Sequence, residues 1–125
     1  MIEIILSHKP PSTNQLYRNA SGGDRKKGRI RTDRYNTWRQ AVGWELNKVH
    51  DKISGPYVMQ ISLCRSMRHH AEDIGNREKA VSDILQEHGI IENDRFCEDL
   101  RIRWADTGGK VVILLDGWSP EAILT

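Results

Sequence analysis

The chain has 125 residues, of which 38% are hydrophobic and 29% are charged, and its formal net charge is only +2. This length suits one domain and is too short for two independent cores, so we expect a single domain over residues 1–125. No apolar run approaches the roughly 20 residues that a membrane-spanning helix needs, and the N-terminal residues lack a secretory pattern. We therefore expect a cytoplasmic protein without a membrane partner.

The first half of the chain predicts a strand, a basic loop and a helix. Apolar residues alternate from residue 2 to residue 6, which predicts a strand that ends before Pro10-Pro11. Residues 12–31 have no apolar periodicity and predict a loop. A helix of about five turns should follow, capped by Thr32 or Asp33, because apolar residues then recur at intervals of three and four: Tyr35, Trp38, Val42, Leu46, Val49 and Ile53.

The second half predicts three strands and one helix. After the break at Gly55-Pro56, alternation over residues 57–64 predicts a strand, and a helix should run from about 75 to 88 and stop at Gly89. Residues 100–104 and 111–115 predict two further strands, which we expect to form a hairpin around residues 107–109. The order strand, helix, strand, helix, strand, strand indicates an α+β fold with two main helices on a mixed four-stranded sheet.

Charge is distributed unevenly along the chain. Residues 18–39 contain eight basic and two acidic residues, a net charge of 8 − 2 = +6. Residues 72–106 contain five basic and ten acidic residues, a net charge of 5 − 10 = −5. Such segments are often solvated surface, but together they also suit a nuclease, which needs cations to hold phosphates and carboxylates to hold a metal ion.

Several polar residues share one face of the second predicted helix. Asn76, Lys79 and Asp83 are separated by three and four residues, while Asp73 precedes the helix and Asp94 follows it. If Asp73 and Asp94 converge, their carboxylates suit Mg²⁺, and Lys79 suits stabilisation of a phosphoryl transition state. Spacing alone also allows a structural reading, with a helix cap, an exposed ion pair and a turn residue.

Two motifs in this sequence resemble the RusA family of Holliday junction resolvases. The segment from Asp73 to Asp94 is similar to the acidic, Asn, Lys and Asp signature of that family, and residues 10–18 are similar to its Pro-Pro-Ser-x-Asn-x-x-Tyr opening. The resemblance implies that Asp73, Lys79 and Asp94 are catalytic and that Asp73 and Asp94 bind the metal ion. The sequence departs from the family at Gly75, where a second aspartate is common; Glu72, Asp83 or a water molecule would then complete the metal site.

The resemblance also implies a homodimer that binds four-way junctions in DNA recombination and repair and makes paired cuts. The cofactor would be Mg²⁺, with Mn²⁺ as a substitute, and no small-molecule cofactor is expected. A two-fold symmetric dimer would match the pseudo-symmetry of the junction. The residues expected to contact DNA are Asn14, Tyr17, Arg18, Arg25, Lys26, Lys27, Arg29, Arg31 and Arg68.

The sequence also allows other functions than that of a nuclease. Loss of the carboxylate at Gly75 would favour a junction-binding protein that does not cut, and a third reading is an unrelated α+β interaction protein. The spacing of His69, His70, His88 and Cys97 matches no compact zinc pattern, and no nucleophile elbow supports a triad of Ser66, His69 and Asp73. Cys64 and Cys97 are expected to be reduced thiols. Trp38 and Trp104 fall on apolar stripes and are expected to be core residues.

Overall fold

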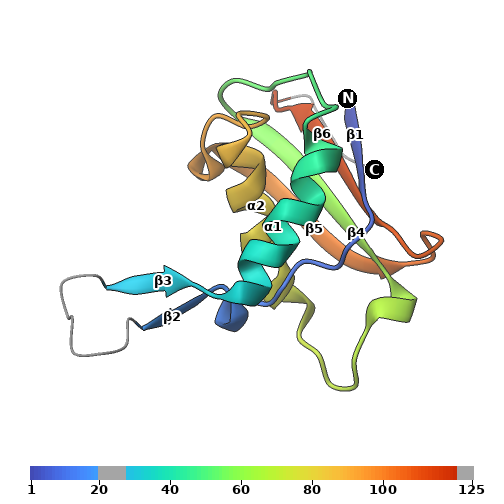
Figure 1. Cartoon of the computed structure of the whole chain (residues 1–125). Helices are drawn as coiled ribbons and strands as arrows, with labels where there is room; N and C mark the ends of the chain where they lie inside the picture. The colour runs from blue at the N-terminus through green and yellow to red at the C-terminus, as the bar shows by residue number, and fades with distance from the viewer. Residues whose placement is uncertain (20–27, 121–125) are drawn as a thin grey trace.

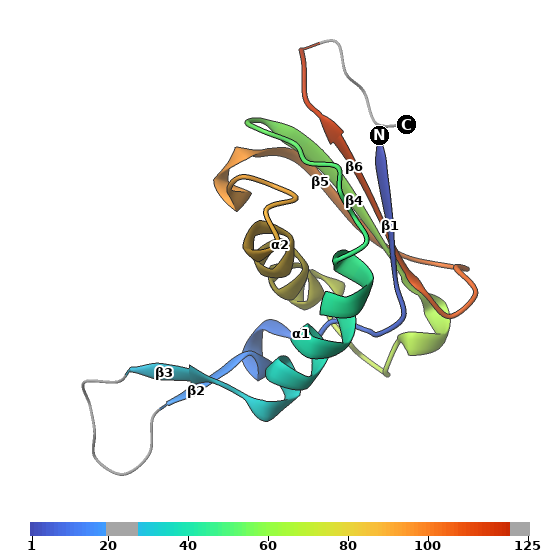
Figure 2. The same cartoon turned by 45° about the horizontal axis from the view of Figure 1, so that its top comes forward.

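A mixed four-stranded sheet carries two helices on one of its faces. The computed structural model describes residues 1–19 and 28–120. Its sheet consists of β1 (Ile2–Leu6), β4 (Tyr57–Cys64), β5 (Cys97–Ala105) and β6 (Val111–Gly117), and its helices are α1 (Asp33–Leu46) and α2 (Glu78–Glu87). Both helices lie on the same side of the sheet (Figures 1 and 2). The predicted α+β class with a mixed four-stranded sheet is confirmed.

The order of the strands differs from the expected hairpin of the last two. The sheet runs β1-β6-β4-β5, so that β6 lies between β1 and β4 and is antiparallel to both. β5 instead pairs in parallel with β4 at the edge of the sheet. The hairpin prediction was wrong because β6 is apolar enough for a central place, whereas charged residues alternate along β5. The connection crosses the end of β4, where the Gly109 amide donates to the Cys64 sulfur at 3.3 Å.

α1 is shorter than the predicted five turns. The Thr32 hydroxyl caps it by accepting a hydrogen bond from the Tyr35 amide at 3.1 Å, as expected, but the helix ends at Leu46. Val49 and Ile53 still pack against the core although they lie beyond the helix. Ile53 forms a parallel bridge with Ile91, so a tertiary contact holds this apolar residue outside the helix.

α2 begins with a tighter turn than predicted and ends where predicted. Residues Ile74–Arg77 form a 3₁₀ turn, which Asp73 caps, and the α-helix proper begins at Glu78. Gly89 follows the helix with φ of +72°. The Gly89 amide donates to the Gln86 carbonyl and the Ile90 amide to the Leu85 carbonyl, a pair of bonds that satisfies the last free carbonyls of the helix.

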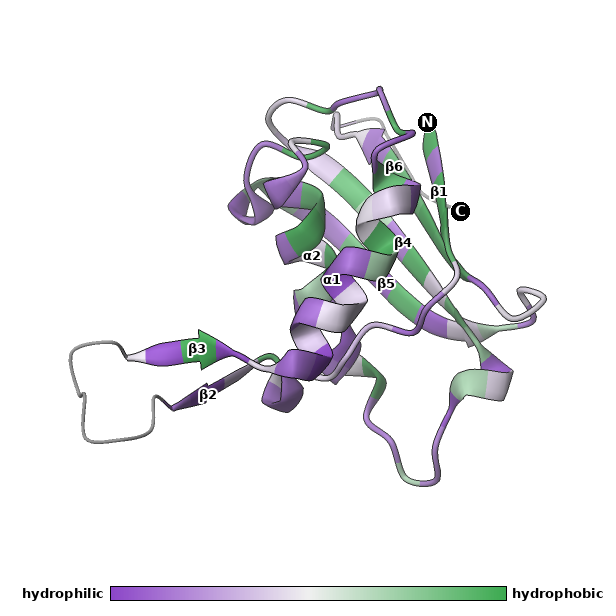
Figure 3. Ribbon diagram, in the orientation of Figure 1, coloured by the Kyte–Doolittle hydropathy of each residue, from purple (hydrophilic) through white to green (hydrophobic). Residues whose placement is uncertain are grey.

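The core lies between the helices and the inner face of the sheet. Alternate residues of β4 contribute to it, as do the apolar faces of α1 and α2, and Trp38 is only 5% exposed. The prediction of a core residue is confirmed for Trp38, whereas Trp104 is only partly buried and packs against the edge of the same cluster. Figure 3 shows hydrophobic residues concentrated in the strands of the sheet and in α2. Burial of this apolar surface is the main force that stabilises the arrangement.

Part of the predicted loop is a hairpin that projects from the domain. After the 3₁₀ turn Thr13–Gln15, β2 (Tyr17–Asn19) pairs antiparallel with β3 (Arg29–Arg31). The hairpin reaches away from the sheet, and β2 is hydrophilic (Figures 1 and 3). The Thr32 amide donates to the Leu16 carbonyl at 3.0 Å, which holds the base of the hairpin at the start of α1.

Two further predictions concern the membrane and the thiols. Within residues 1–19 and 28–120, no helix combines the length and apolar character that a bilayer crossing requires. Cys64 and Cys97 are both free thiols, as predicted. The pKa of the Cys64 thiol is lowered to about 6, mainly by its hydrogen bond with the Ser66 hydroxyl.

Candidate active site at the start of α2

Lys79 lies between two carboxylates that come from different elements. Its ammonium is 3.0 Å from a carboxylate oxygen of Asp83, one turn along α2, and 3.4 Å from one of Asp94, at the start of the 3₁₀ turn Asp94–Phe96. The hydrogen bond with Asp83 is the main cause that raises the pKa of Lys79, and Asp94 adds to it. The lysine therefore stays positively charged at neutral pH.

A glutamine on the same helix face positions Asp94. The Gln86 side-chain oxygen accepts a hydrogen bond from the Asp94 backbone amide at 3.0 Å, and the Asn93 side chain caps the turn that Asp94 begins. Sequence reasoning missed Gln86. The signal was present, since Lys79, Asp83 and Gln86 are spaced by four and three residues and therefore share one face of the helix.

These residues line an open hollow that the projecting hairpin also borders. The hollow has a volume of about 540 Å³, and Tyr17 and Arg31 of the hairpin line it together with Lys79, Asp83 and Gln86. The hollow thus brings Tyr17 and Arg31 of the hairpin to the same surface as Lys79 and Asp83 of α2.

Two aromatic residues form the floor between the hairpin and α1. Tyr17 packs edge-on against Tyr35, with ring centroids 5.7 Å apart, and the Arg29 guanidinium lies 5.5 Å from the Tyr17 ring. Burial and the nearby Asp83 carboxylate raise the pKa of Tyr35 to about 12, so this hydroxyl stays protonated. Tyr17 is half-buried by these contacts and holds the hairpin against the domain.

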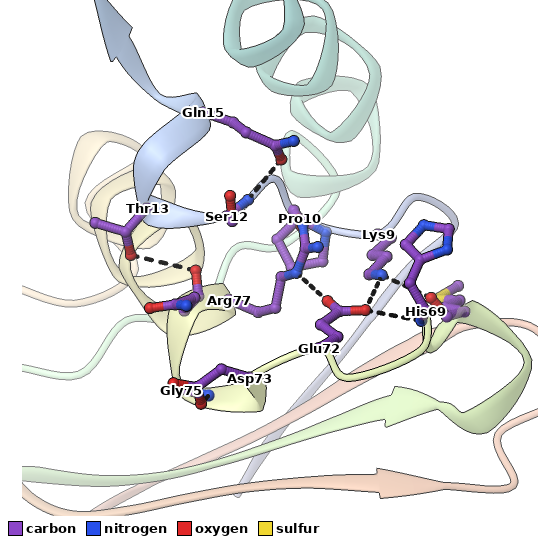
Figure 4. A network of polar contacts seen from close by, with 12 residues as sticks. Lys9, Pro10, Ser12, Thr13, Gln15, His69, Glu72, Asp73, Gly75 and Arg77 are labelled. Carbon is purple, nitrogen blue, oxygen red and sulfur yellow. Dashed lines mark hydrogen bonds and ion pairs between the residues drawn. The ribbon is translucent and has the colours of Figure 1, made fainter.

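Asp73 has a different local environment from Lys79 and Asp94. One of its carboxylate oxygens accepts a hydrogen bond from the Gly75 amide at 3.0 Å, whereas the Lys79 ammonium pairs with Asp83 and Asp94 and, among the described residues, not with Asp73. The side chain turns toward Gly75 (Figure 4). A Cβ atom at Gly75 would lie 3.5 Å from this oxygen, an ordinary contact, so the position has room for a side chain.

Glu72 binds two cations on the other side of this segment. Its carboxylate is 8% exposed and pairs with Lys9 at 2.7 Å and with the Arg77 Nε (Figure 4). Burial alone would raise the pKa of Glu72, but hydrogen bonds from Lys9, the His69 amide and Arg77 lower it to about 2. The expectation that Glu72 replaces a carboxylate at Gly75 finds no support in this geometry, because Lys9 and Arg77 occupy both of its oxygens.

The remaining predicted DNA contacts lie in separate parts of the chain. Asn14 lies in the first 3₁₀ turn, Arg18, Arg29 and Arg31 lie in the hairpin, and the Arg68 guanidinium lies 5.6 Å from the Trp104 ring. The predicted contacts at residues 25–27 fall outside the described residues. Among the residues that are described, no group of three or more His, Cys, Asp or Glu side chains is arranged to hold a metal ion, and this includes the histidines weighed for zinc.

A lysine held between carboxylates beside a cationic hairpin is suited to chemistry on a phosphate group. The sequence matches the family Endodeoxyribonuclease RusA over residues 8–115, which reach from the end of β1 into β6. Because this match covers most of the chain, the protein belongs to the RusA family of endodeoxyribonucleases. No curated protein matches the chain.

Proposed function

We propose that this protein is a metal-dependent, structure-specific endodeoxyribonuclease that resolves four-way DNA junctions in recombination and repair. The observation that carries the proposal is the ammonium of Lys79, set between Asp83 and Asp94 in a hollow that the cationic hairpin also lines. Membership of the RusA family supports the class of reaction.

Lys79 is proposed to stabilise the charge that builds up on the scissile phosphate. Its raised pKa keeps it protonated, and its side chain is 48% exposed, so the ammonium is accessible to a substrate. A preorganised donor to a developing oxyanion contributes about 10²–10³ to the rate. A phosphate oxygen entering the hollow would compete with Asp83 and Asp94 for the hydrogens of Lys79.

The carboxylates fit the proposed Mg²⁺ or Mn²⁺. Asp83 and Asp94 are oxygen donors that are 24% and 36% exposed, and Asp83 also lines the open hollow. Mg²⁺ often binds through one or two carboxylates plus substrate phosphate. We assign Asp73 and Asp94 as the main ligands, with Asp83 as the candidate for the position that Gly75 leaves without a carboxylate. A bound divalent ion supplies an activated water and neutralises charge on the phosphate.

The hairpin and its surroundings are proposed to position the DNA. Arg18, Arg29 and Arg31 supply cations for backbone phosphates. We propose the same role, from the sequence, for Arg25, Lys26 and Lys27, and DNA contacts for Asn14, Tyr17 and Arg68. Such contacts position a duplex without reading its sequence. Paired cuts require two active sites, which we propose are supplied by a homodimer with two-fold symmetry.

The test is cleavage of an end-labelled synthetic four-way junction in Mg²⁺ or Mn²⁺. Paired nicks are expected from the wild-type protein, and Asp73→Asn, Asp94→Asn and Lys79→Met should each lower the rate by about 10² or more. Asp51→Asn, a carboxylate removal in an exposed loop, is the matched control and should leave the rate unchanged. Junction binding without nicks in either metal would overturn the nuclease and favour the non-cleaving junction-binding protein.

Gly75 offers a gain-of-function version of this test. Gly75→Asp places a carboxylate next to Asp73, where a Cβ atom makes only an ordinary contact. The Mg²⁺ concentration for the half-maximal rate should fall about tenfold, which corresponds to 1.4 kcal/mol. Gly75→Asn has the same shape without the charge and should not lower it. Equal metal dependence of these two variants would argue against a metal site beside Asp73.

A further inference from the structure

A second hollow region lies on the side of the domain where Glu72 clamps its two cations. Lys9, Arg34 and Trp38 line both a hollow of about 300 Å³ and a neighbouring one of about 420 Å³. Because these three residues are shared, the two hollows adjoin, and we call them together the Lys9–Arg34 groove. Arg77 and His69 line its first part, and His8 lines its second part.

The charge of the groove has a single sign. Lys9, Arg34 and Arg77 are basic residues, and none of the described residues that line either part is an aspartate or glutamate. The hollow beside Lys79 differs in this respect, since Asp83 and Glu87 line it. When the buried Glu72, which pairs with Lys9 and Arg77, is included, the net charge of these four residues is 3 − 1 = +2. The groove therefore suits an anion.

Two of the cations are held in place before any ligand arrives. The Lys9 ammonium donates to the Met67 carbonyl at 2.6 Å and to Glu72 at 2.7 Å. Arg77 donates through Nε to Glu72 and through Nη1 to the Pro10 carbonyl at 2.9 Å. Figure 4 shows these side chains converging from the two sides of Glu72. Because Glu72 and the backbone carbonyls fix the two cations, little side-chain entropy remains to be lost on binding.

Arg34 completes the groove from the first turn of α1. Its side chain is exposed, and it forms no ion pair within the part of the chain that the structure describes. Within the described residues, Arg34 thus adds an exposed third cation to the groove that Lys9 and Arg77 also line. It is also the residue whose removal should disturb the fold least.

We propose that the Lys9–Arg34 groove binds a backbone phosphate of the DNA at a position away from the cleaved bond. This inference rests on the proposed function and extends it to a second phosphate. Arg77, which lines the groove, stands only two residues before Lys79 in the chain. The Thr13 hydroxyl donates to the Asn76 carbonyl at 3.2 Å, so the Pro-Pro-Ser segment is attached to the turn that separates the two sites. DNA that crosses the start of α2 therefore contacts both the hollow and the groove.

The experiment measures junction affinity with EDTA in place of Mg²⁺, so that no strand is cut. Arg34→Gln and the double variant Arg34→Gln/His69→Gln should bind several-fold more weakly than wild type. The slope of log K against log salt should fall in magnitude by about 0.9 for each phosphate contact that is lost. Lys48→Gln, just beyond the other end of α1, removes one exposed cation outside the groove and should change neither quantity. Arg31→Gln in the hairpin serves as the reference for a contact of the proposed active site.

Phosphate ethylation interference then locates the contact. Ethylation of one or two phosphates should weaken wild-type binding, and Arg34→Gln should be insensitive to at least one of them. If Arg31→Gln weakens binding while Arg34→Gln matches Lys48→Gln in affinity and slope, the groove proposal is overturned and the proposed function stands. If the wild-type protein binds no DNA, both fall together.

Discussion

Replacing Glu72 by glutamine tests how strongly the clamp between Lys9 and Arg77 stabilises the fold. Glu72 is 8% exposed, and its partners lower its pKa from the ordinary 4.5 to about 2. The difference between a pKa of 4.5 and one of about 2 corresponds to on the order of 3 kcal/mol. Since glutamine keeps the shape but loses the charge and leaves two cations without their carboxylate, Glu72→Gln should destabilise the protein by about 2–3 kcal/mol at pH 7.

The lowered pKa of Glu72 also predicts how the stability of the protein changes with pH. Because the pKa is lower in the folded state, the stabilisation is complete above pH 4.5 and is lost as the pH falls from 4.5 to about 2. The wild-type protein should therefore lose stability over that window, whereas Glu72→Gln should lose less. The difference between them should be largest at pH 7 and should shrink toward pH 2.

Urea denaturation at a series of pH values between 7 and 2.5 provides the measurement. Glu87→Gln is the matched control, because Glu87 also pairs with an arginine, Arg39, but is 45% exposed. An exposed pair of this kind contributes about 0–1 kcal/mol. If Glu72→Gln and Glu87→Gln cost the same free energy and follow the same pH profile, the clamp does not stabilise the fold as argued.

Three further predictions concern the helix ends and Lys79, the proposed catalytic lysine. Thr32→Ala removes the cap of α1 and should cost about 1 kcal/mol in a urea titration, while the exposed Thr37→Ala should cost less; equal losses would rule out a capping role. Gly89→Ala places a side chain at φ of +72° and should also cost about 1 kcal/mol, and an unchanged midpoint would contradict the assigned helix end. Because neighbouring carboxylates raise the pKa of Lys79, this lysine should stay protonated at neutral pH, so the rate ratio of wild type to Lys79→Met should be the same at pH 7 and pH 8; a Lys79-dependent loss near pH 8 would refute its assignment as a protonated donor.

The predictions that succeeded rest on neighbours in the chain. The cap at Thr32 and the helix end at Gly89 follow from the local chemistry of backbone groups, and the structure has both. Alternation over β4 and the i, i+4 pair of Lys79 and Asp83 are likewise properties of a single element. These features can be read from the sequence because their energies depend on residues only a few positions apart.

The hairpin of β2 and β3 could not be read in this way. Its strands are three residues each, and polar side chains obscure any apolar alternation. The pairing of Tyr17 with Arg31 depends instead on Thr32, whose amide binds the Leu16 carbonyl and closes the base of the hairpin. A loop was therefore predicted where tertiary contacts produce two strands.

What the sequence alone determined about this protein is the α+β class, the ends of its helices, the cationic segment and the residue types of the candidate site. Tertiary structure decided which of them meet. β6 took the central place between β1 and β4, and β5 lies at the edge of the sheet. Asp94 lies near Lys79 although 15 positions separate them, and Glu72 pairs with Lys9 across 63 positions. The physical reason is that local signals act within one element, whereas partners distant in the chain are selected only when the whole core packs and burial removes the alternatives.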